Sequence, residues 1–390
     1  MIKLIKSTFH NEADTKRKLI DFISGAEMLS FGSECQKFEK SFSEWQGRKC
    51  TTFVNSGSSA NLAVIQALLN LGRIKRGDKV AFSALTWSTN AMPLIQLGLE
   101  VIPVDVELDT LNVSSKKLKE VLKKYDVKML FITNLLGFCD DIDEIQRICE
   151  DKNIILAEDN CESLGTVYKG KKLGNFGVAS TFSFYVGHHM STIEGGAICT
   201  DDEELSNMLS LVRAHGWDRN LTEKNQNDIR AKHDVNSSFY SRYTFYDLGY
   251  NLRPNEINGF IGNTQIPYLE EIVSIREATF KRLAGIIYAN TDAFYPIRYS
   301  HLDTVSNFAV PIICKSKAIR DKLVEKCNGK IELRPIVGGD MTKQPFFNKY
   351  SSFELVKSNA GLIHEQGLYF GNNPELTDKE IEEIATAFTI

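Results

Sequence analysis

Short apolar runs alternate with amphipathic segments through the first two-thirds of this chain, and this alternation limits the folds open to it more than any other feature. The apolar runs predict strands at 50–54, 79–83, 100–105, 127–133, 154–158, 180–185 and 196–200. Helical spacing of apolar residues predicts helices at 58–71, 88–97, 114–125 and 141–152, with Ser114 and Asp141 as caps. Strands joined through helices form a mostly parallel sheet, because each crossover lays a helix on one of its faces. The predicted fold class is therefore α/β.

The final third of the chain has a different pattern, which begins with a long helical segment from about 255 to 291. The remaining predicted elements are helices at 13–24, 33–46, 315–327, 353–363 and 377–388 and strands near 305–314 and 331–336. This order predicts a large α/β domain at residues 1–250, which binds the ligand, and a smaller C-terminal α+β domain at residues 251–390. The stretch 218–245 is polar and weakly periodic, so it is predicted to be a long loop that acts as a lid or a dimer arm.

The composition argues against several classes of function. A net charge of −4 and a pI near 6.1 give no basic field, so nucleic acid is not an expected partner and a small molecule is. The N-terminal residues become polar too early for a signal peptide, and no run of about 20 apolar residues could span a bilayer. We therefore expect a cytoplasmic protein without a membrane partner. No two of the eight cysteines are closer than ten residues, so no metal or iron–sulfur site is predicted.

The junction after strand 50–54 has the composition of an anion site. Ser56, Gly57 and Ser58 stand where this strand gives way to a helix. Small hydroxylated residues at a helix start present N–H groups, hydroxyls and the positive helix end to an anion such as phosphate. The same residues are also common as a plain cap and turn, so both interpretations stay open.

Two carboxylates and a tryptophan follow other predicted strands. Asp159 and Glu162 lie just past strand 154–158, where a carboxylate needs a partner because burial of an unpaired charge is unfavourable. Trp87 follows strand 79–83, and its indole has the flat face that stacks on an aromatic ring. Helix capping by the carboxylates and simple core packing of the tryptophan are the alternatives.

No lysine occurs from Leu173 to Glu223, whereas two adjacent histidines, His188 and His189, stand within that stretch. The side chains of adjacent residues diverge, so only one of the pair is expected to face a given site. Their spacing is neither HxH nor HxxxH, and no cysteine adjoins them, so metal binding is not predicted. A surface histidine or a hydrogen-bonded core histidine is the ordinary alternative, so a special role for His188 depends on the motifs around it.

Seven short motifs, which span essentially the whole chain, form a joint pattern. They are NSGSSANL (55–62), LTWST (85–89), AEDNCES (157–163), GNFGVASTFSFY (174–185), EGGAICTDDEE (194–204), RAHGW (213–217) and YNLRPNEINGFIG (250–262). Together and in this order they resemble the nucleotide-sugar aminotransferase family of pyridoxal-phosphate (PLP) fold type I. In that family a PLP-binding lysine lies six positions before the E-G-G motif. Six positions before Glu194 this sequence has His188. A histidine at the lysine position makes the sequence similar to the branch of the family that dehydrates its sugar.

The resemblance implies roles for particular residues. The cofactor-binding set is Ser56, Gly57, Ser58, Trp87, Asp159, Glu162, Ser183 and Asn251, and the set near the sugar or nucleotide is His215, Arg219, Arg253 and Arg334. Asp159 would keep the pyridine nitrogen protonated, Trp87 would cover the ring, and Glu162 would lie close to the cofactor or substrate. Asn251 would reach the phosphate of the neighbouring subunit's cofactor, so a homodimer is expected.

The implied reaction is dehydration, since an imidazole at position 188 cannot form an imine with PLP but can still transfer a proton. The expected substrate is a nucleotide-linked 4-keto-6-deoxy sugar, with GDP as the expected nucleotide, which would lose its C3 hydroxyl. PLP and its aminated form, pyridoxamine phosphate (PMP), would be the cofactors, and L-glutamate the amino donor, in deoxysugar biosynthesis for lipopolysaccharide or capsule. Two alternatives stay open: an aminotransferase anchored by Lys169, Lys171 or Lys172, and a non-catalytic protein that binds nucleotide sugars. A second dehydratase branch, with an iron–sulfur cluster, would need clustered cysteines, which this sequence lacks.

Overall fold

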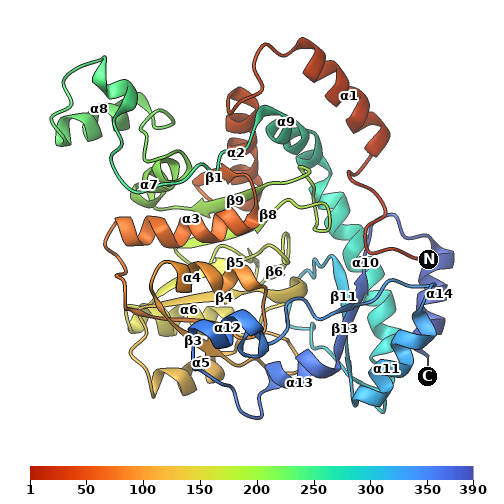
Figure 1. Cartoon of the computed structure of the whole chain (residues 1–390). Coiled ribbons are helices and arrows are strands. Elements are labelled where there is room, and N and C mark those ends of the chain that lie inside the picture. The colour runs from red at the N-terminus through yellow and green to blue at the C-terminus, as the bar shows by residue number, and fades with distance from the viewer. Residues whose placement is uncertain (390) are drawn as a thin grey trace.

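The computed structural model describes residues 1–389, and its main sheet has seven strands in the order β1-β9-β8-β5-β4-β2-β3 (Figure 1). They are β1 (Cys50–Val54), β2 (Lys79–Ser83), β3 (Glu100–Val104), β4 (Met129–Thr133), β5 (Ile155–Asp159), β8 (Ala179–Ser183) and β9 (Gly196–Thr200). Strand β9 runs antiparallel to both of its neighbours, and the other neighbouring strands are parallel. The predicted α/β class with a mostly parallel sheet is confirmed.

Both faces of the main sheet are buried, which explains why its strands are continuous apolar runs. The helices on its two faces are α3 (Gly57–Asn70), α4 (Met92–Gln96) and α7 (Glu203–Arg213) on one and α5 (Ser115–Leu122) and α6 (Ile142–Asp151) on the other. Met129 and Phe131 of β4 share an apolar cluster with α3 and α7. The alternate residues Leu130 and Ile132 share another cluster with α5 and α6. Side chains of one strand thus divide between two cores, as the period of a strand requires.

The N-terminal helices close one end of the main sheet. They are α1 (Glu12–Gly25) and α2 (Ser33–Gln46), and both pack against α9 (Glu256–Gln265). Phe42 of α2 contacts the rings of Phe182 and Phe184 at centroid distances of 5.2 and 5.1 Å. Gly259 allows α9 to approach α2 closely, because a Cβ at that position would lie 2.5 Å from the backbone nitrogen of Cys35.

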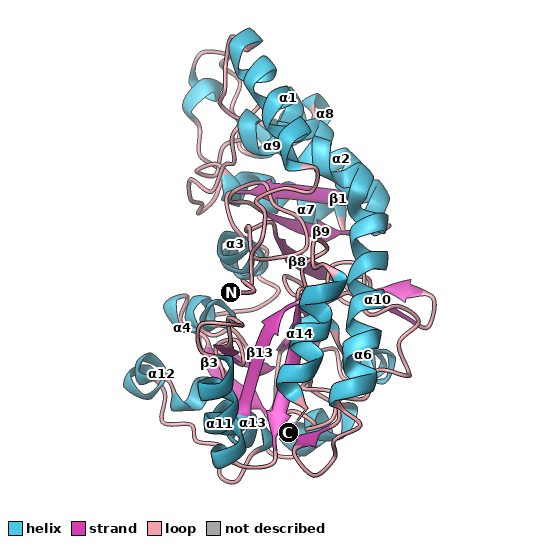
Figure 2. Ribbon diagram, turned by 90° about the vertical axis from the view of Figure 1, so that its right-hand side faces the viewer, coloured by secondary structure: helices cyan, strands magenta, loops and turns pink. Residues whose placement is uncertain are grey.

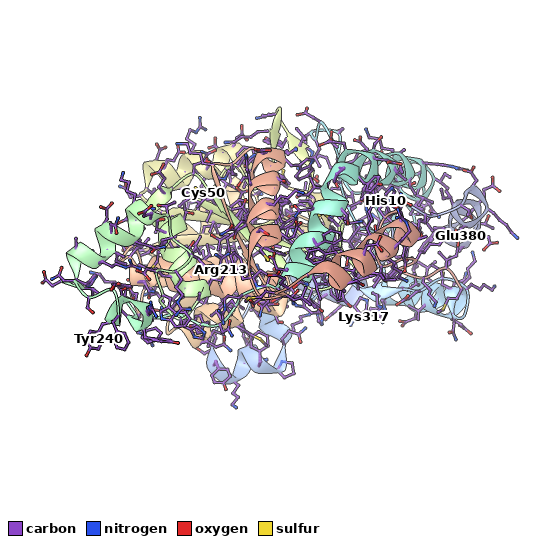
Figure 3. All side chains as sticks on the ribbon, turned by 90° about the horizontal axis from the view of Figure 1, so that it is seen from above. His10, Cys50, Arg213, Tyr240, Lys317 and Glu380 are labelled. Atoms are coloured by element: carbon purple, nitrogen blue, oxygen red, sulfur yellow. The ribbon has the colours of Figure 1, made fainter. Side chains whose placement is uncertain are left out.

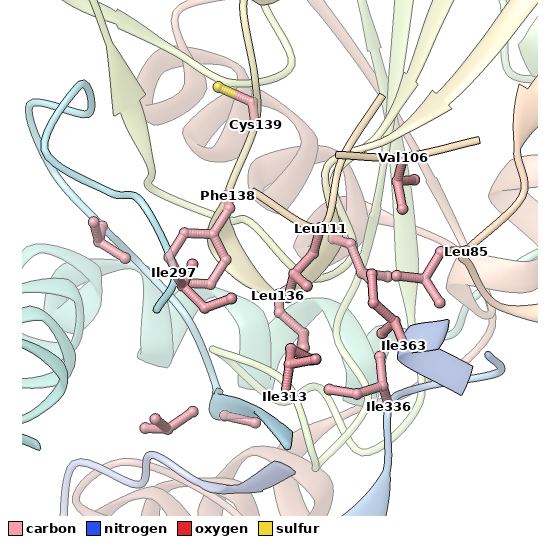
Figure 4. Close-up of a cluster of buried hydrophobic side chains, with 14 of the residues drawn as sticks. Leu85, Val106, Leu111, Leu136, Phe138, Cys139, Ile297, Ile313, Ile336 and Ile363 are labelled. Carbon is pink, nitrogen blue, oxygen red and sulfur yellow. The ribbon is translucent and has the colours of Figure 1, made fainter. Parts of the chain in front are cut away.

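A second, antiparallel sheet of order β10-β11-β13-β12 lies toward the C-terminus (Figure 2). The elements of this region are α10 (Leu269–Ile287), β10 (Phe294–Tyr295), β11 (Ala309–Cys314), α11 (Lys317–Cys327), β12 (Arg334–Pro335), α12 (Pro345–Tyr350), α13 (Asn359–Gln366), β13 (Gly367–Gly371) and α14 (Asp378–Phe388). Leu136 and Phe138, after β4, share one apolar cluster with Ile313 and Ile336 of this region (Figure 4). A hairpin of β6 (Val167–Tyr168) and β7 (Lys171–Lys172) forms a small third sheet. The domain boundary after residue 250 stays a prediction.

The predicted loop at 218–245 is partly wrong, because it contains helix α8 (Glu223–Lys232) and a 3-10 turn at Tyr240–Tyr243. Helix α8 has no buried residue, so it carries no apolar periodicity that the sequence could reveal. It is held by its cap, in which Thr222 accepts from Asn225 N, and by an ion pair of 2.7 Å between Arg230 and Asp218. This arm (residues 218–245) stands out from the body, with Tyr240 at its outer end (Figures 1 and 3).

Two further expectations need correction. The predicted helix from 255 to 291 is divided into α9 and α10 by a 3-10 turn that contains Pro267. Asp141 does not cap its own helix; its Oδ1 accepts from Ser115 N, at the start of α5, at 2.7 Å. Ser114 does cap α5, as predicted. None of the helices in residues 1–389 combines the length and apolarity that a membrane crossing requires.

Candidate active site

The start of α3 meets the ends of two central strands. Ser56 caps α3 and accepts a hydrogen bond from Ser59 N at 3.1 Å. A Cβ at the buried Gly57 would lie 2.5 Å from Ser183 Cβ and 3.0 Å from Cys161 Sγ. The helix start therefore touches both the end of β8 and the turn after β5. Ser58, the next residue, is exposed. The N-terminal N–H groups of α3, a helix of 14 residues, lie at this junction, where they can bind an anion.

Gly57→Ala tests this junction. The added methyl would collide with Ser183, and overpacking of this kind destabilises a protein by about 1–3 kcal/mol. We expect a lower melting temperature and PMP binding weaker by roughly tenfold. The control is Gly285→Ala in α10, where no atom lies within 4 Å of the new methyl, and stability should not fall. Equal PMP affinity in the two variants would remove Gly57 from the cofactor site.

Asp159 is a buried carboxylate whose partners in residues 1–389 are neutral. Its Oδ2 accepts from the side-chain amides of Asn61 and Asn90 at 2.9 and 2.7 Å. Its Oδ1 accepts from Cys161 N at 2.9 Å. A buried negative charge without a cation is unfavourable, and a protonated pyridine nitrogen supplies both the charge and a donor. The residues present therefore fit the cofactor that the sequence implies.

Trp87 borders the same site and is 53% exposed, which excludes the core-packing alternative. Its backbone carbonyl accepts from Asn90 N at 3.1 Å, and the Asn90 side chain donates to Asp159. The turn that carries the indole is thus tied to the carboxylate. An aromatic surface left open beside a buried anion suits a flat cationic ring.

His188 lies in a turn after β8, next to Ser183. Burial lowers its pKa to about 4, while a hydrogen bond to the Ser183 backbone and the charge of Asp159 oppose this shift. The ring packs at 5.2 Å from that of Phe308, and Arg276 Nη2 donates to the His188 carbonyl at 3.2 Å. At neutral pH His188 is uncharged, so it can take a proton. His189 is buried and bonded to the Ser306 carbonyl instead.

Glu162 is a second buried carboxylate, three positions after Asp159. Burial and the charge of Asp159 raise its pKa to about 8, although Leu136 N donates to its Oε2 at 3.0 Å. Near neutral pH Glu162 is therefore protonated and His188 is not. Opposed shifts of this kind are typical of a site that handles protons.

Glu162 should make stability depend on pH. The pKa of Glu162 in the folded state lies above the ordinary 4.5, so the folded state holds this proton more tightly than the unfolded state does. The stability that the protonated carboxyl contributes is fully present below about pH 4.5 and is lost as the pH rises through 8. We expect cofactor-free Glu162→Gln to match the wild type near about pH 5 and to exceed it by a few kcal/mol near about pH 9. Melting temperatures across this range measure the effect, and the exposed Glu325→Gln is the control. A constant difference at all pH values would contradict a raised pKa.

The predicted substrate residues divide into two places. Arg334 lies at β12, where its charge opposes the rise in the pKa of Tyr369 that burial and the charge of Glu162 cause. The other three are exposed at the base of the arm and are His215, Arg219 and Arg253; Asn251, of the predicted cofactor-binding set, is exposed in the same region. Their contacts are local: Arg253 Nε donates to Asn251 Oδ1 at 3.0 Å, and Arg219 stacks on Trp217 at 4.0 Å.

Sequence reasoning missed the amides that hold Asp159. Asn61 and Asn90 are both buried, and Asn61 is itself fixed by a hydrogen bond of 2.7 Å from Thr181. For Asn61 the signal was an amide side chain about one turn after the predicted anion site, on the helix that begins there. Arg276 gave no local signal, because it lies on α10, 88 residues from His188.

The three lysines of the aminotransferase alternative are engaged elsewhere. Lys169 pairs with Asp143 at 2.6 Å, and the ammonium of Lys172 lies 3.6 Å from the centre of the Trp45 ring. Lys171 lies over the ring of Phe176 at 4.5 Å. All three belong to the β6–β7 hairpin, so none is placed to anchor a cofactor at Asp159.

Comparison with known proteins agrees with this geometry. Residues 10–389 match the model of the DegT/DnrJ/EryC1/StrS aminotransferase family. The chain is 37% identical over 374 residues to GDP-4-keto-6-deoxy-D-mannose 3-dehydratase of Escherichia coli O55:H7, with 94% of this chain and 95% of the relative covered. A crystal structure of a histidine-to-asparagine variant of GDP-4-keto-6-deoxymannose 3-dehydratase with bound GDP-perosamine matches at TM-score 0.89 and 33% identity, with 100% of both chains covered. Another, with a trapped PLP–glutamate geminal diamine, matches at TM-score 0.90 and 34% identity over 100% of both chains. The chain therefore belongs to the DegT/DnrJ/EryC1/StrS aminotransferase family.

Proposed function

We propose that the protein is a PLP/PMP-dependent 3-dehydratase of a GDP-linked 4-keto-6-deoxy sugar. It would remove the C3 hydroxyl to give a 4-keto-3,6-dideoxy sugar, and L-glutamate would restore PMP. Support for the sugar and for glutamate comes from the ligands named in the two similar crystal structures. Support for the reaction comes from the name of the similar Escherichia coli enzyme.

The observation that carries the proposal is the position of His188. A neutral imidazole lies beside Ser183 and within the field of Asp159, where this family holds its lysine. An imidazole cannot bind the cofactor covalently, and so it leaves PMP free to meet a keto sugar.

The residues of the site have complementary tasks. When bound, PMP supplies an amine that takes the sugar carbonyl and a cationic ring that accepts the electron pair left by proton removal. Asp159 accepts a hydrogen bond from the ring nitrogen and keeps its proton in place. His188 removes a proton from cofactor carbon C4′ and, once protonated, donates one as the hydroxyl leaves. Glu162 keeps a proton for hydrogen bonding to the cofactor or substrate.

The remaining assignments concern binding. Ser183 and the α3 start, from Ser56 through Gly57 to Ser58, hold the phosphate, while Trp87 stacks on the ring. The residues proposed to face the sugar or nucleotide are His215, Arg219, Arg253 and Arg334.

We also propose a homodimer in which Asn251 reaches the partner subunit's cofactor. Exposed apolar side chains of the arm and of the segment between it and Asn251 support it, since exposed apolar surface marks an interaction site. They are Phe239, Tyr240, Tyr243, Phe245 and Leu248. Sedimentation should give twice the chain mass. Mixed dimers of His188→Asn and Asn251→Ala should regain one intact site and hence activity, whereas no regain would place both residues in one subunit's site.

Product analysis tests the reaction. The enzyme is incubated with PLP, L-glutamate and GDP-4-keto-6-deoxymannose or its dTDP-glucose counterpart. We expect ammonia, 2-oxoglutarate and a sugar lighter by one oxygen, with the GDP substrate preferred. An amino sugar would establish transamination instead, and no uptake of either cofactor form would establish a non-catalytic protein.

A further inference from the structure

Tyr369 is the one residue of strand β13 that is not buried. Its neighbours Leu368 and Phe370 lie in the apolar core, so the period of a strand turns Tyr369 to the opposite face of the C-terminal sheet. The register places Tyr369 directly opposite Arg334 of β12, and the side chains of such a pair project from the same face. Tyr369, which has no role in the function proposed above, is therefore a neighbour of a residue that has one.

This face of the sheet contacts the turn that carries His188. The ring of Tyr369 meets that of Phe308 edge-on at a centroid distance of 6.2 Å, and the ring of Phe308 lies 5.2 Å from that of His188. The charge of Glu162 also acts on Tyr369. The surroundings of Tyr369 thus include three residues of the candidate active site, His188, Glu162 and Arg334.

The hydroxyl of Tyr369 is open to a ligand. It has no hydrogen-bond partner in residues 1–389, yet it is not fully buried. Burial of the ring and the charge of Glu162 raise the pKa of Tyr369 to about 12, while the charge of Arg334 opposes this shift. The hydroxyl therefore keeps its proton near neutral pH and can donate a hydrogen bond.

The charges beside Tyr369 select the kind of ligand. Glu332 Oε1 accepts from Arg334 Nε and Nη2 at 3.0 and 2.5 Å, so this ion pair has no net charge. Glu332 is itself held by Leu4 N, which donates to its Oε2 at 3.0 Å. Glu162, whose pKa burial raises to about 8, is protonated near neutral pH. A diphosphate or a carboxylate binds best to an unpaired cation, whereas a neutral hydroxylated ligand suits surroundings without net charge.

We propose that Tyr369 is a further substrate-binding residue, whose hydroxyl donates a hydrogen bond to a ring hydroxyl of the bound sugar. That the ligand is a sugar rests on the function proposed above. The same site must also take L-glutamate, which has no hydroxyl group of this kind. Only one of the two reactants thus makes this hydrogen bond, and a site that pairs with a substrate hydroxyl discriminates against a molecule that lacks it.

Tyr369→Phe removes the hydroxyl and nothing else. The probe is GDP-mannose, which has ring hydroxyls but no keto group to react with PMP, and its binding to the PMP-loaded protein is compared with that of GDP by calorimetry. We expect the affinity for GDP-mannose to fall by about five- to tenfold, the loss of one hydrogen bond, while the affinity for GDP stays unchanged. The melting temperature should not change, because the hydroxyl makes no hydrogen bond within residues 1–389.

The reaction with L-glutamate separates the sugar from the cofactor. The rate at which L-glutamate converts bound PLP to PMP, followed by absorbance, should be the same in Tyr369→Phe and in the wild type. The matched control is Tyr295→Phe. Tyr295 is a half-buried tyrosine of the same sheet, on β10, which β11 separates from β13. Its substitution should alter none of these quantities.

Three results would each overturn the proposal. They are equal binding of GDP-mannose by Tyr369→Phe and the wild type, an equal loss for GDP and GDP-mannose, which would place the hydroxyl at the nucleotide, and a slower reaction with L-glutamate, which would place it at the cofactor. GDP-mannose binding does not require dehydration, so a failure here is distinct from a failure of the product analysis.

Discussion

His188→Asn is expected to abolish dehydration while PMP still binds. Asparagine is polar and close in size to histidine, but it cannot take or return a proton near neutral pH. Loss of general acid–base catalysis lowers a rate by about 10²–10⁴-fold, and here one residue serves both directions. The proposed cofactor contacts at Ser183 and Asp159 lie on other elements and are unaltered. Product formation by mass spectrometry and fluorescence of the bound PMP measure the two properties separately.

The matched control for this variant is His233→Asn. His233 is exposed at the end of α8, in the arm, and should leave turnover unchanged. Retention of more than about a tenth of wild-type turnover by His188→Asn would exclude His188 as the essential base. Loss of PMP binding together with activity would instead give the residue a binding role.

The sheet could be predicted from the sequence because its strands are buried on both faces. The limits predicted for β1, β2 and β9 agree with the structure to the residue. Helix α8 could not be predicted, because none of its residues is buried and its sequence therefore has no apolar face with helical spacing. Strand β13 (Gly367–Gly371) was also missed, since it directly follows helix α13 with no turn residues between them.

The site could be predicted only in part. The place of His188 follows from its fixed spacing to Glu194, which is a property of neighbouring positions in the chain. The lowered pKa of His188 and the raised pKa of Glu162 arise from burial, which no local motif encodes. The contact of Arg276 with the His188 carbonyl likewise joins elements that only the fold brings together.

Asp159→Asn is the second substitution with a large expected effect. The carboxylate accepts hydrogen bonds on both oxygens, whereas asparagine has one acceptor and would turn its own N–H₂ toward a donor. We expect the cofactor-free protein to lose about 1–3 kcal/mol of stability. Without the negative charge the pyridine nitrogen is no longer held protonated, and turnover should fall by on the order of 10²-fold or more.

A comparison of three variants isolates the charge of Asp159 from its packing. Thermal unfolding is measured with and without PMP, because a ligand that binds only the folded state raises the melting temperature. Asn61→Ala removes one hydrogen bond to Asp159 but keeps its charge. The variant should therefore be less stable, while PMP should raise its melting temperature as much as in the wild type. Asp126→Asn, an exposed change, should alter neither quantity by more than about 0.5 kcal/mol. Asp159→Asn alone should lose most of the rise in melting temperature that PMP causes. A full gain in that variant would show that the buried carboxylate does not bind the cofactor ring, and the fit between this pocket and a cationic pyridine would fail.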